Sequence, residues 1–306
     1  MTQVFAGSAA YLRSSVQPVL SIGNFDGLHM GHRHLIKALV TRAHSLNAPA
    51  CVYTFDPPPR VVLAPQQHQP RIQSWPDKVR IMGELGVDHV IVERFTRSFA
   101  QHPPDWFVSE VLVNRINPVS IVVGYDFRYG RARAGDVHAL RAALPDMNID
   151  QVSALEMGDT VVSSSRIRQL VAQGLVAEAS VLLGCDHLIR GTVVSGDQRG
   201  RTIGFPTANL ETDSELLPVR GVYAVRARTD GGQWNDAVAN LGVRPTFDGR
   251  GFLVEVHLLD FSGDLYGSEM EVAFVQRLRG EQEFNGSDEL VKQIHLDVQA
   301  ARESLA

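Results

Sequence analysis

The chain has 306 residues, more than one compact hydrophobic core usually serves, so we expect two domains, with a single large α/β domain as the alternative. Hydrophobic residues make up 44% and charged residues 21%, which excludes a disordered or fibrous chain. A formal net charge of -5 argues against a broad nucleic-acid-binding surface, because such surfaces gather Lys and Arg against phosphates.

Cysteine usage and hydropathy predict where the protein works. The only cysteines, Cys51 and Cys185, form neither a CxxC pair nor a Cys/His metal cluster, which favours a reduced, cytoplasmic setting. The first 19 residues lack a secretory signal, and no segment has about 18 consecutive apolar residues. We therefore expect neither a membrane nor a nucleic acid as a partner.

The N-terminal half alternates short apolar runs with helical patterns, which predicts a parallel sheet built from βαβ units. The runs are Val19–Ile22, Ala50–Phe55, His89–Val92 and Ser120–Val123. Two covering helices are expected, one over His34–Ala43 and one over Asp105–Val113. The second helix would turn four side chains inward, namely Trp106, Val108, Leu112 and Val113.

The string SIGNFDGLHMGHRH follows the first predicted strand and opens the first helix. Its glycines permit a tight turn, and a helix N-terminus offers free N–H groups and partial positive charge to an anion. His29 and His32 are three residues apart, so both imidazoles can donate hydrogen bonds to one phosphate. A Gly-rich turn alone equally suits a purely structural role. The candidate ATP-binding residues are Gly23, Asn24, Phe25, Asp26, Gly27, His29, Gly31 and His32.

Two later segments complete the first candidate site. The string VGYDFRYGRARAG follows the fourth predicted strand and offers Asp126 and Arg128 as a flavin or nucleotide loop, since ligands gather at the carboxyl ends of parallel strands. The string SSSRIR begins a predicted helix, where hydroxyls cap the helix and arginines meet phosphates. Such a cluster is also common at a solvated helix start. Its candidate ATP-binding residues are Ser164, Ser165, Arg166 and Arg168.

The pattern changes after about Val152, where two helices over Ser163–Val171 and Leu175–Leu183 predict a connector ending at Gly184. We place one domain at residues 1–184 and a second at 185–306. In the second, strand-like alternation divided by turns predicts a small antiparallel barrel closed by a terminal helix over Ser287–Ser304. Its strands are expected over Gly191–Val194, Gly221–Arg228, Trp234–Leu241, Phe252–Leu259 and Glu269–Leu278.

The string GTVVSGDQRGRTIGFPTANL lies at the start of this half and has neither a Walker A lysine nor GxGxxG. Glycine-rich turns in β-proteins are usually structural. Farther on, VEVHLLDF alternates as a strand, with Glu255 and His257 on one face; a carboxylate there is normally solvated, and we expect His257 to be structural.

The motifs together resemble those of the bacterial bifunctional riboflavin kinase/FAD synthetase family over nearly the whole chain. The HxGH string is similar to the nucleotidyltransferase signature of a Rossmann-like FMN adenylyltransferase domain, whose histidines stabilise charge on the triphosphate. In the second half, the positions that resemble the riboflavin kinase signature are Gly191, Gly196, Gly200, Arg201, Gly204, Pro206, Thr207, Ala208 and Asn209.

The resemblance implies two ATP-dependent reactions, riboflavin to FMN and FMN to FAD, each with Mg²⁺. It implies that Thr207 and Asn209 hold the metal and that Glu255 is the general base for the riboflavin 5′-hydroxyl. Arg244 and the segment Arg279–Phe284 resemble flavin or phosphate contacts, and a plain surface turn is as good an interpretation of each. In the segment TFDPPPR, the family usually has Glu and His where this chain has Asp56 and Pro58.

Two other functions stay open at this point. One is a flavin- or nucleotide-binding regulator with a decayed catalytic site, against which the presence of both histidines, Thr207, Asn209 and Glu255 argues. The other is a nucleotidyltransferase acting on tRNA or pantetheine phosphate, which would leave the kinase-like half without a purpose. The sequence does not determine the oligomeric state.

Overall fold

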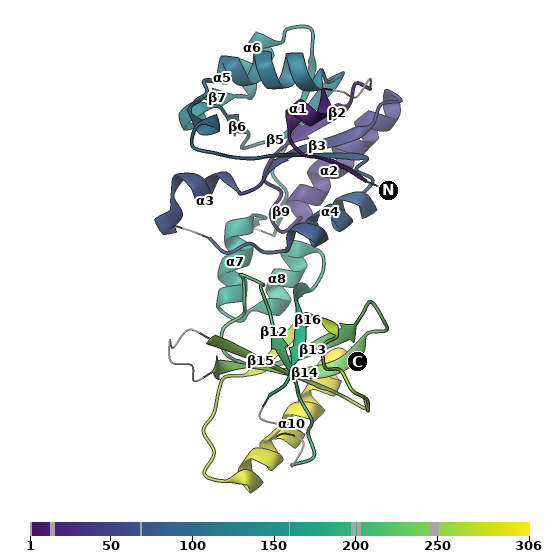
Figure 1. Cartoon of the computed structure of the whole chain (residues 1–306), viewed down its shortest axis with the longest axis vertical. Helices are drawn as coiled ribbons and strands as arrows, with labels where there is room; N and C mark the ends of the chain where they lie inside the picture. The colour runs from purple at the N-terminus through teal and green to yellow at the C-terminus, as the bar shows by residue number, and fades with distance from the viewer. Residues whose placement is uncertain are drawn as a thin grey trace. The chain divides into compact units, whose positions relative to one another are not determined.

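The computed structural model describes residues 2–12, 16–67, 69–158, 160–196, 200, 203–244 and 251–306; of residues 243, 244, 251 and 252 only the backbone is described. The chain separates into two compact units (Figure 1). The first comprises Met1–Pro70 and Ser74–Ser163, and the second comprises Arg71–Gln73 and Ser164–Ala306. The boundary between the units therefore falls before the two connector helices, while the division of activities between 1–184 and 185–306 stays a prediction.

A six-stranded parallel sheet forms the centre of the first unit, in the order β1-β4-β3-β2-β5-β8. The four predicted strands are confirmed to within one residue as β2 (Val19–Ile22), β3 (Ala50–Phe55), β4 (His89–Glu93) and β5 (Ser120–Gly124). The edge strands β1 (Gln3–Phe5) and β8 (Asn148–Val152) were not predicted. The hydropathy pattern does not reveal either strand, because an edge strand is short and buries few side chains. For example, β8 buries only Ile149.

Helices cover both faces of this sheet and bury its alternate side chains in two cores. On one face lie α2 (Met30–Ser45) and α4 (Trp75–Glu84), packed on Val19, Val52 and Val90. On the other lie α1 (Ser8–Tyr11), the π-helix η3 (Phe107–Ile116) and α6 (Val137–Ala143). The strand order reverses at β2, whose neighbours are β3 and β5, and in such sheets ligands bind at the carboxyl ends beside the reversal.

Short elements join these layers. The helical turns are α3 (Pro59–Leu63), η1 (Pro65–Gln67), η2 (Phe99–Gln101), α5 (Pro104–Trp106) and η4 (Arg131–Arg133). Two small hairpins pair β6 (Arg128–Tyr129) with β7 (Gly135–Asp136) and β9 (Glu156–Met157) with β10 (Thr160–Val161).

For the helix expected over Asp105–Val113, the prediction that Val113 faces inward was wrong. Most of it is the π-helix η3, which buries Phe107, Val111, Leu112 and Ile116, while Val113 is 45% exposed. An α-helical period of 3.6 residues predicted Val113 to face inward. The i→i+5 hydrogen bonds of a π-helix widen the turn, so the buried positions recur about every fourth or fifth residue instead.

The second unit is a closed antiparallel barrel in the order β11-β12-β15-β14-β13-β16. All five predicted strands occur, as β11 (His187–Val194), β13 (Gly221–Thr229), β14 (Asn235–Arg244), β15 (Gly251–Leu258) and β16 (Glu269–Arg279). The sixth, β12 (Ala208–Glu211), was not predicted because it is the end of the glycine-rich motif. One core of alternating strand residues, among them Val225, Val254 and Phe274, fills the interior.

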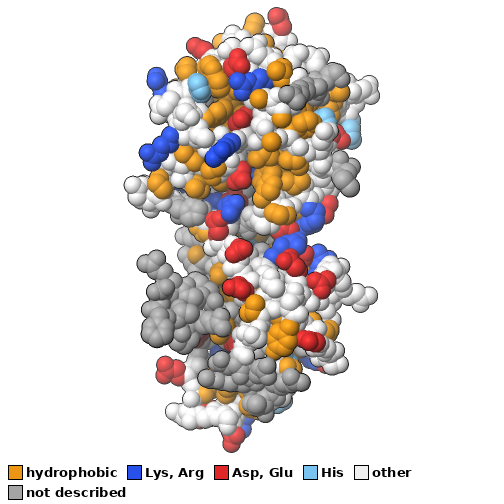
Figure 2. Space-filling view, viewed as in Figure 1, with side chains coloured by type: hydrophobic (Ala, Val, Ile, Leu, Met, Phe, Trp, Pro, Cys, Tyr) orange, Lys and Arg blue, Asp and Glu red, His pale blue; other side chains and the backbone are white. Residues whose placement is uncertain are grey.

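Among the described helices, α8 (Val176–Leu183) and α10 (Ser287–Leu305) pack on the outside of this barrel, and α7 (Ser164–Ala172) packs on α8. The connector helices α7 and α8 are confirmed, and α8 contacts β11 and β16. The terminal helix α10 packs Ala301 and Leu305 against Ala224 of β13. Among the described residues, no helix is both long and apolar enough to cross a membrane. On the face shown in Figure 2, charged side chains of both signs are interspersed.

Candidate active sites

The turn after β2 is held by core packing. Phe25 and Leu28 have positive φ angles of 50° and 40°, and both side chains are buried. Gly27 lies between them with φ 86°, a conformation that glycine adopts without a steric penalty. Because two buried anchors fix this left-handed path, the backbone between β2 and α2 is set before any ligand arrives.

The two histidines of this turn stack on one another. His29 is the N-cap of α2, and its Nδ1 accepts a hydrogen bond of 3.2 Å from the backbone N–H of His32. In the neutral ring Nε2 must then carry the proton. The ring centroids are 3.7 Å apart with an interplanar angle of 14°. Gly31 permits this approach, because a Cβ there would be 3.2 Å from the His29 ring.

His32 has an unusual electrostatic environment. Its Nδ1 is buried and, within the part of the chain that is described, has no hydrogen-bond partner. Burial first, and then His29 and Lys78, lower the pKa of His32 well below its ordinary value. The imidazole is therefore neutral near pH 7. A buried polar atom without a partner is uncommon and often marks a functional site.

Lys78 was missed by the sequence analysis. It lies on α4, is only 8% exposed, and its Nζ donates to the backbone oxygen of Asn24 and to Thr54 Oγ1, the latter at 3.2 Å. Thr54 Oγ1 also donates to Asn24 O at 3.2 Å. A single lysine on an amphipathic helix is normally solvated, so the sequence holds no signal for this one.

The segment after β5 is placed at the carboxyl edge of the same sheet. Phe127 and Tyr129 turn inward and join the core, whereas Asp126 and Arg128 are exposed. Arg128 Nη1 is 3.0 Å from Asp136 Oδ2 across the β6–β7 hairpin. The exposed side chains thus belong to a loop anchored by its aromatic neighbours.

The SSSRIR segment begins at Ser163, the last residue of the first unit, and its other residues start α7 in the second unit. Ile167 is buried, while Ser165 and Arg166 are exposed, and Arg166 Nη1 donates to Gln169 Oε1 at 3.0 Å. The histidine pair belongs to the first unit, so a joint ATP site of Arg166 and Arg168 with the histidines stays a prediction.

Three polar residues come together on the outer face of the barrel. In the register of the sheet, Glu255 of β15 lies opposite Asn209 of β12 and opposite Asn240 of β14. Asn240 Nδ2 donates to Glu255 Oε2 at 3.2 Å. Both Val254 and Val256 point into the barrel core, as the predicted alternation required. Asn240 was missed, although the alternation of β14 would have found it.

Two glycines of the Gly-rich motif allow close approaches near this cluster. A Cβ on Gly196 would be 2.1 Å from Asn209 Nδ2, and one on Gly200 would be 2.3 Å from Phe205 O. Thr207 Oγ1 also lies near Gly200, at 3.5 Å from its ideal Cβ position. Gly204 has φ 89°. Arg201 lies outside the described residues.

The remaining motif glycine, Gly191, lies on β11. A Cβ on it would be 2.2 Å from Glu211 O, so a larger residue would separate β11 from β12. The loop itself is tied to β15, because Pro206 O accepts a hydrogen bond of 2.8 Å from His257 Nδ1. This contact agrees with a structural role for His257, which stays a prediction.

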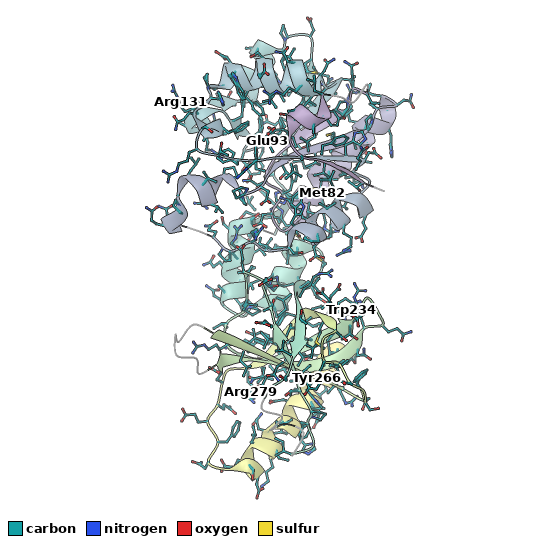
Figure 3. The ribbon with its side chains drawn as sticks, in the orientation of Figure 1. Met82, Glu93, Arg131, Trp234, Tyr266 and Arg279 are labelled. Carbon is teal, nitrogen blue, oxygen red and sulfur yellow. The ribbon has the colours of Figure 1, made fainter. Side chains whose placement is uncertain are left out.

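The predicted flavin segment Arg279–Phe284 begins with a structural ion pair. Arg279, labelled in Figure 3, has its Nη2 2.8 Å from Asp297 Oδ2 and its Nε 2.9 Å from Asp297 Oδ1. This pair joins β16 to α10. The side chain of Arg244 lies outside the described residues.

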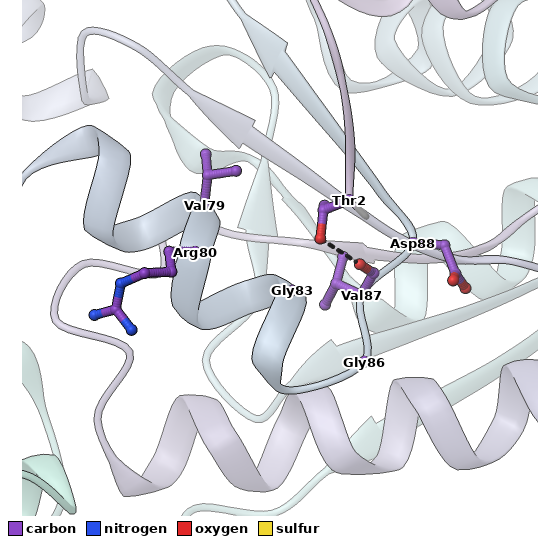
Figure 4. Close-up of a pocket in the computed structure, with 7 residues that line it drawn as sticks. All are labelled: Thr2, Val79, Arg80, Gly83, Gly86, Val87 and Asp88. Atoms are coloured by element: carbon purple, nitrogen blue, oxygen red, sulfur yellow. Dashed lines mark hydrogen bonds between the residues drawn. The ribbon is translucent and has the colours of Figure 1, made fainter. Parts of the chain in front are cut away.

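A pocket of about 370 Å³ opens at the amino-terminal edge of the first sheet (Figure 4). Its polar groups are used within the protein: Thr2 Oγ1 donates to Val87 O, Asp88 Oδ2 accepts from Ala50 N, and Arg80 pairs with Glu84. The pocket therefore lacks polar groups aimed at a ligand, and it lies at the opposite edge from the histidine pair.

Comparison with known proteins places these two clusters in one family. A family model described as FAD synthetase matches residues 13–166, and one described as riboflavin kinase matches residues 183–305. The bifunctional riboflavin kinase/FMN adenylyltransferase of Escherichia coli K12 is 41% identical over 287 residues, 93% of this chain and 92% of that protein. The chain belongs to this bifunctional family.

Other members of the bifunctional riboflavin kinase/FMN adenylyltransferase family match over a similar length. The Listeria monocytogenes protein is 36% identical, covering 94% of this chain and 93% of its own. A crystal structure titled a macrolide-efflux protein from Streptococcus pneumoniae has a TM-score of 0.91 at 32% identity, with 98% of each chain covered. Each compact unit thus contains one family match.

Proposed function

We propose that the chain makes FAD from riboflavin in two steps, with riboflavin phosphorylated on the barrel unit and FMN adenylylated on the sheet unit. The observation that carries the proposal is the position of Glu255 opposite Asn209, with the loop of Thr207 closing beside them. A carboxylate and two oxygen-bearing side chains at one place suit phosphoryl transfer from a metal-bound nucleotide to a hydroxyl.

In the kinase step, Glu255 accepts the proton of the riboflavin 5′-hydroxyl. The hydroxyl oxygen then forms a bond to the γ-phosphorus of ATP, and the bond to the ADP oxygen breaks. Asn240 orients the carboxylate through its hydrogen bond to Oε2. A general base must lie within hydrogen-bond reach of the proton that it accepts, and holding one oxygen leaves the other directed at the substrate.

The side chains present fit a magnesium ion. Thr207 supplies a hydroxyl and Asn209 an amide oxygen, and Mg²⁺ prefers oxygen donors while keeping several waters. Gly196 allows the Asn209 side chain to lie against the backbone of the loop, because a Cβ there would be only 2.1 Å from Asn209 Nδ2. When bound, the ion would neutralise charge on the ATP phosphates. Within the described residues, no group of three His, Cys, Asp or Glu forms an alternative metal site.

In the adenylyltransferase step, an FMN phosphate oxygen attacks the α-phosphorus of ATP and pyrophosphate leaves. The nucleophile is already anionic, so the protein needs mainly to position the reactants and to stabilise charge. His29 offers its Nε2–H, and the free N–H groups at the start of α2 point toward the same anion.

Variants changed in only one of the two candidate active sites test which site performs each step. We expect Glu255→Gln to abolish FMN formation while leaving FAD formation from supplied FMN, and His29→Ala with His32→Ala to do the reverse. Products are resolved by chromatography after incubation with ATP and magnesium. The matched controls are Glu269→Gln, an exposed glutamate on β16, and His34→Ala, an exposed histidine on α2.

Loss of both activities in either folded variant would contradict independent sites. If the wild-type protein bound flavin and ATP but formed neither FMN nor FAD, the alternative of a regulator with decayed sites would replace the proposal. The same incubation with flavin, ATP and magnesium also distinguishes the proposed enzyme and the regulator from a nucleotidyltransferase that uses another acceptor.

A further inference from the structure

Lys78 is a buried cation that neither reaction step uses. It lies on α4, and only 8% of it is exposed. Burying an ammonium group is unfavourable unless hydrogen bonds compensate it, and an uncompensated lysine loses its charge instead. Its hydrogen bonds to Asn24 O and Thr54 Oγ1, and its position 5.5 Å from the Trp75 ring centroid, supply that compensation.

These contacts connect three elements of the adenylyltransferase site. Asn24 belongs to the turn that leads into α2, and Thr54 lies near the carboxyl end of β3. Thr54 itself donates to Asn24 O, so the backbone oxygen of the turn receives two hydrogen bonds. The ammonium thereby ties the turn to β3 and α4.

The turn that Lys78 contacts leads directly to the histidine pair. His29 stacks on the His32 ring, and Phe25 of the turn packs against it at 5.3 Å between centroids. From α4 the charge of Lys78 also disfavours an imidazolium at His32, while the adjacent Asp77 contacts Ser74 and Arg80.

We propose that Lys78 is a positioning residue of the adenylyltransferase site, which holds the Gly23–Gly27 turn, and with it the start of α2, in place through its hydrogen bonds to Asn24 O and Thr54 Oγ1. This inference rests on the proposed adenylyltransferase function.

Two substitutions separate the charge of Lys78 from its hydrogen bonds. Lys78→Gln keeps a donor and removes the charge, whereas Lys78→Arg keeps both, and Lys37→Gln on the exposed face of α2 is the matched control. We expect Lys78→Gln to lower kcat/KM for ATP in FAD formation by on the order of tenfold or more, because a charged hydrogen bond is lost. Lys78→Arg should retain most of that activity, and riboflavin phosphorylation should be unchanged in all three.

A second measurement does not depend on activity. In the full-length protein, hydrogen exchange of the backbone amides in the Gly23–Gly27 turn should become faster in Lys78→Gln and stay unchanged in Lys78→Arg and Lys37→Gln. Unchanged exchange of these amides in a folded Lys78→Gln protein, or full FAD formation by it, would overturn the role of Lys78. Failure of the wild-type protein to form FAD would instead count against the proposed function.

Discussion

Two histidines with buried ring nitrogens, His32 in the first unit and His187 in the second, show how burial alters the chemistry of a residue. His32 keeps an unpartnered ring nitrogen beside a helix N-terminus, whereas His187 is fully enclosed at the start of β11. Since a carbonyl can only accept, His187 Nε2 donates to Leu216 O at 3.0 Å. The first environment suits ligand binding, and the second suits only a structural role.

The enclosed position of His187 predicts acid sensitivity of the barrel. Burial lowers its pKa to about 4, from the usual value near 6.5. Below about pH 6.5 the unfolded chain binds a proton that the folded chain does not, so this group destabilises the fold as the pH falls toward 4. Linkage predicts a loss of about 2 kcal/mol in the free energy of unfolding between pH 7 and pH 5.

Urea unfolding at both pH values, followed through hydrogen exchange of barrel amides, measures this effect. His187→Gln retains a donor for Leu216 O and removes the titration, so its pH dependence should be smaller by that amount. An equal pH dependence in the variant and the wild type would show that other groups are responsible.

Among the secondary-structure elements, α10 is attached to the barrel by two ion pairs that differ in burial. Arg279–Asp297 has side chains only 17% and 6% exposed, while Arg302–Asp260 is 50% and 74% exposed. Both have N–O distances of 2.8 Å, so they differ mainly in solvent access. Removing one partner of a buried pair leaves an uncompensated charge, whereas water replaces the partner in an exposed pair.

We therefore expect Asp297→Ala to lower the free energy of unfolding by about 3 kcal/mol or more. Asp260→Ala, its matched control, should change it by less than about 1 kcal/mol. Thermal or urea unfolding of the two variants gives the comparison directly. Similar effects of the two substitutions would mean that solvent access does not decide the strength of these pairs.

The π-helix η3 illustrates the limit of pattern analysis for an element. Its position and its covering role followed from the apolar residues between Trp106 and Val113. Its wider turn did not, because the hydrogen-bond period depends on how the helix packs against its neighbours, among them α1, and the sequence carries no mark of that packing.

For the whole molecule, two compact units with separate cores predict two sites joined by a diffusible product. A mixture of Glu255→Gln with the His29→Ala, His32→Ala double variant should make FAD from riboflavin, because one protein supplies FMN and the other consumes it. The rate should rise with total protein concentration and fall when an excess apoflavodoxin-type trap binds free FMN. An inactive mixture of variants that each retain one activity would indicate FMN transfer within a single chain.

From the sequence alone came the two fold classes, the strands β2 to β5, and the HxGH, Gly-rich and VEVH motifs that carry the proposed chemistry. These follow from local hydrophobic period, turn residues and motif spacing, all of which lie within short stretches of chain. Only the tertiary structure placed Asn240 on Glu255, buried Lys78 behind the Asn24 turn, and paired Arg279 with Asp297. Such contacts join residues distant in the chain, and whether a polar side chain meets water or a partner is decided by the elements packed around it.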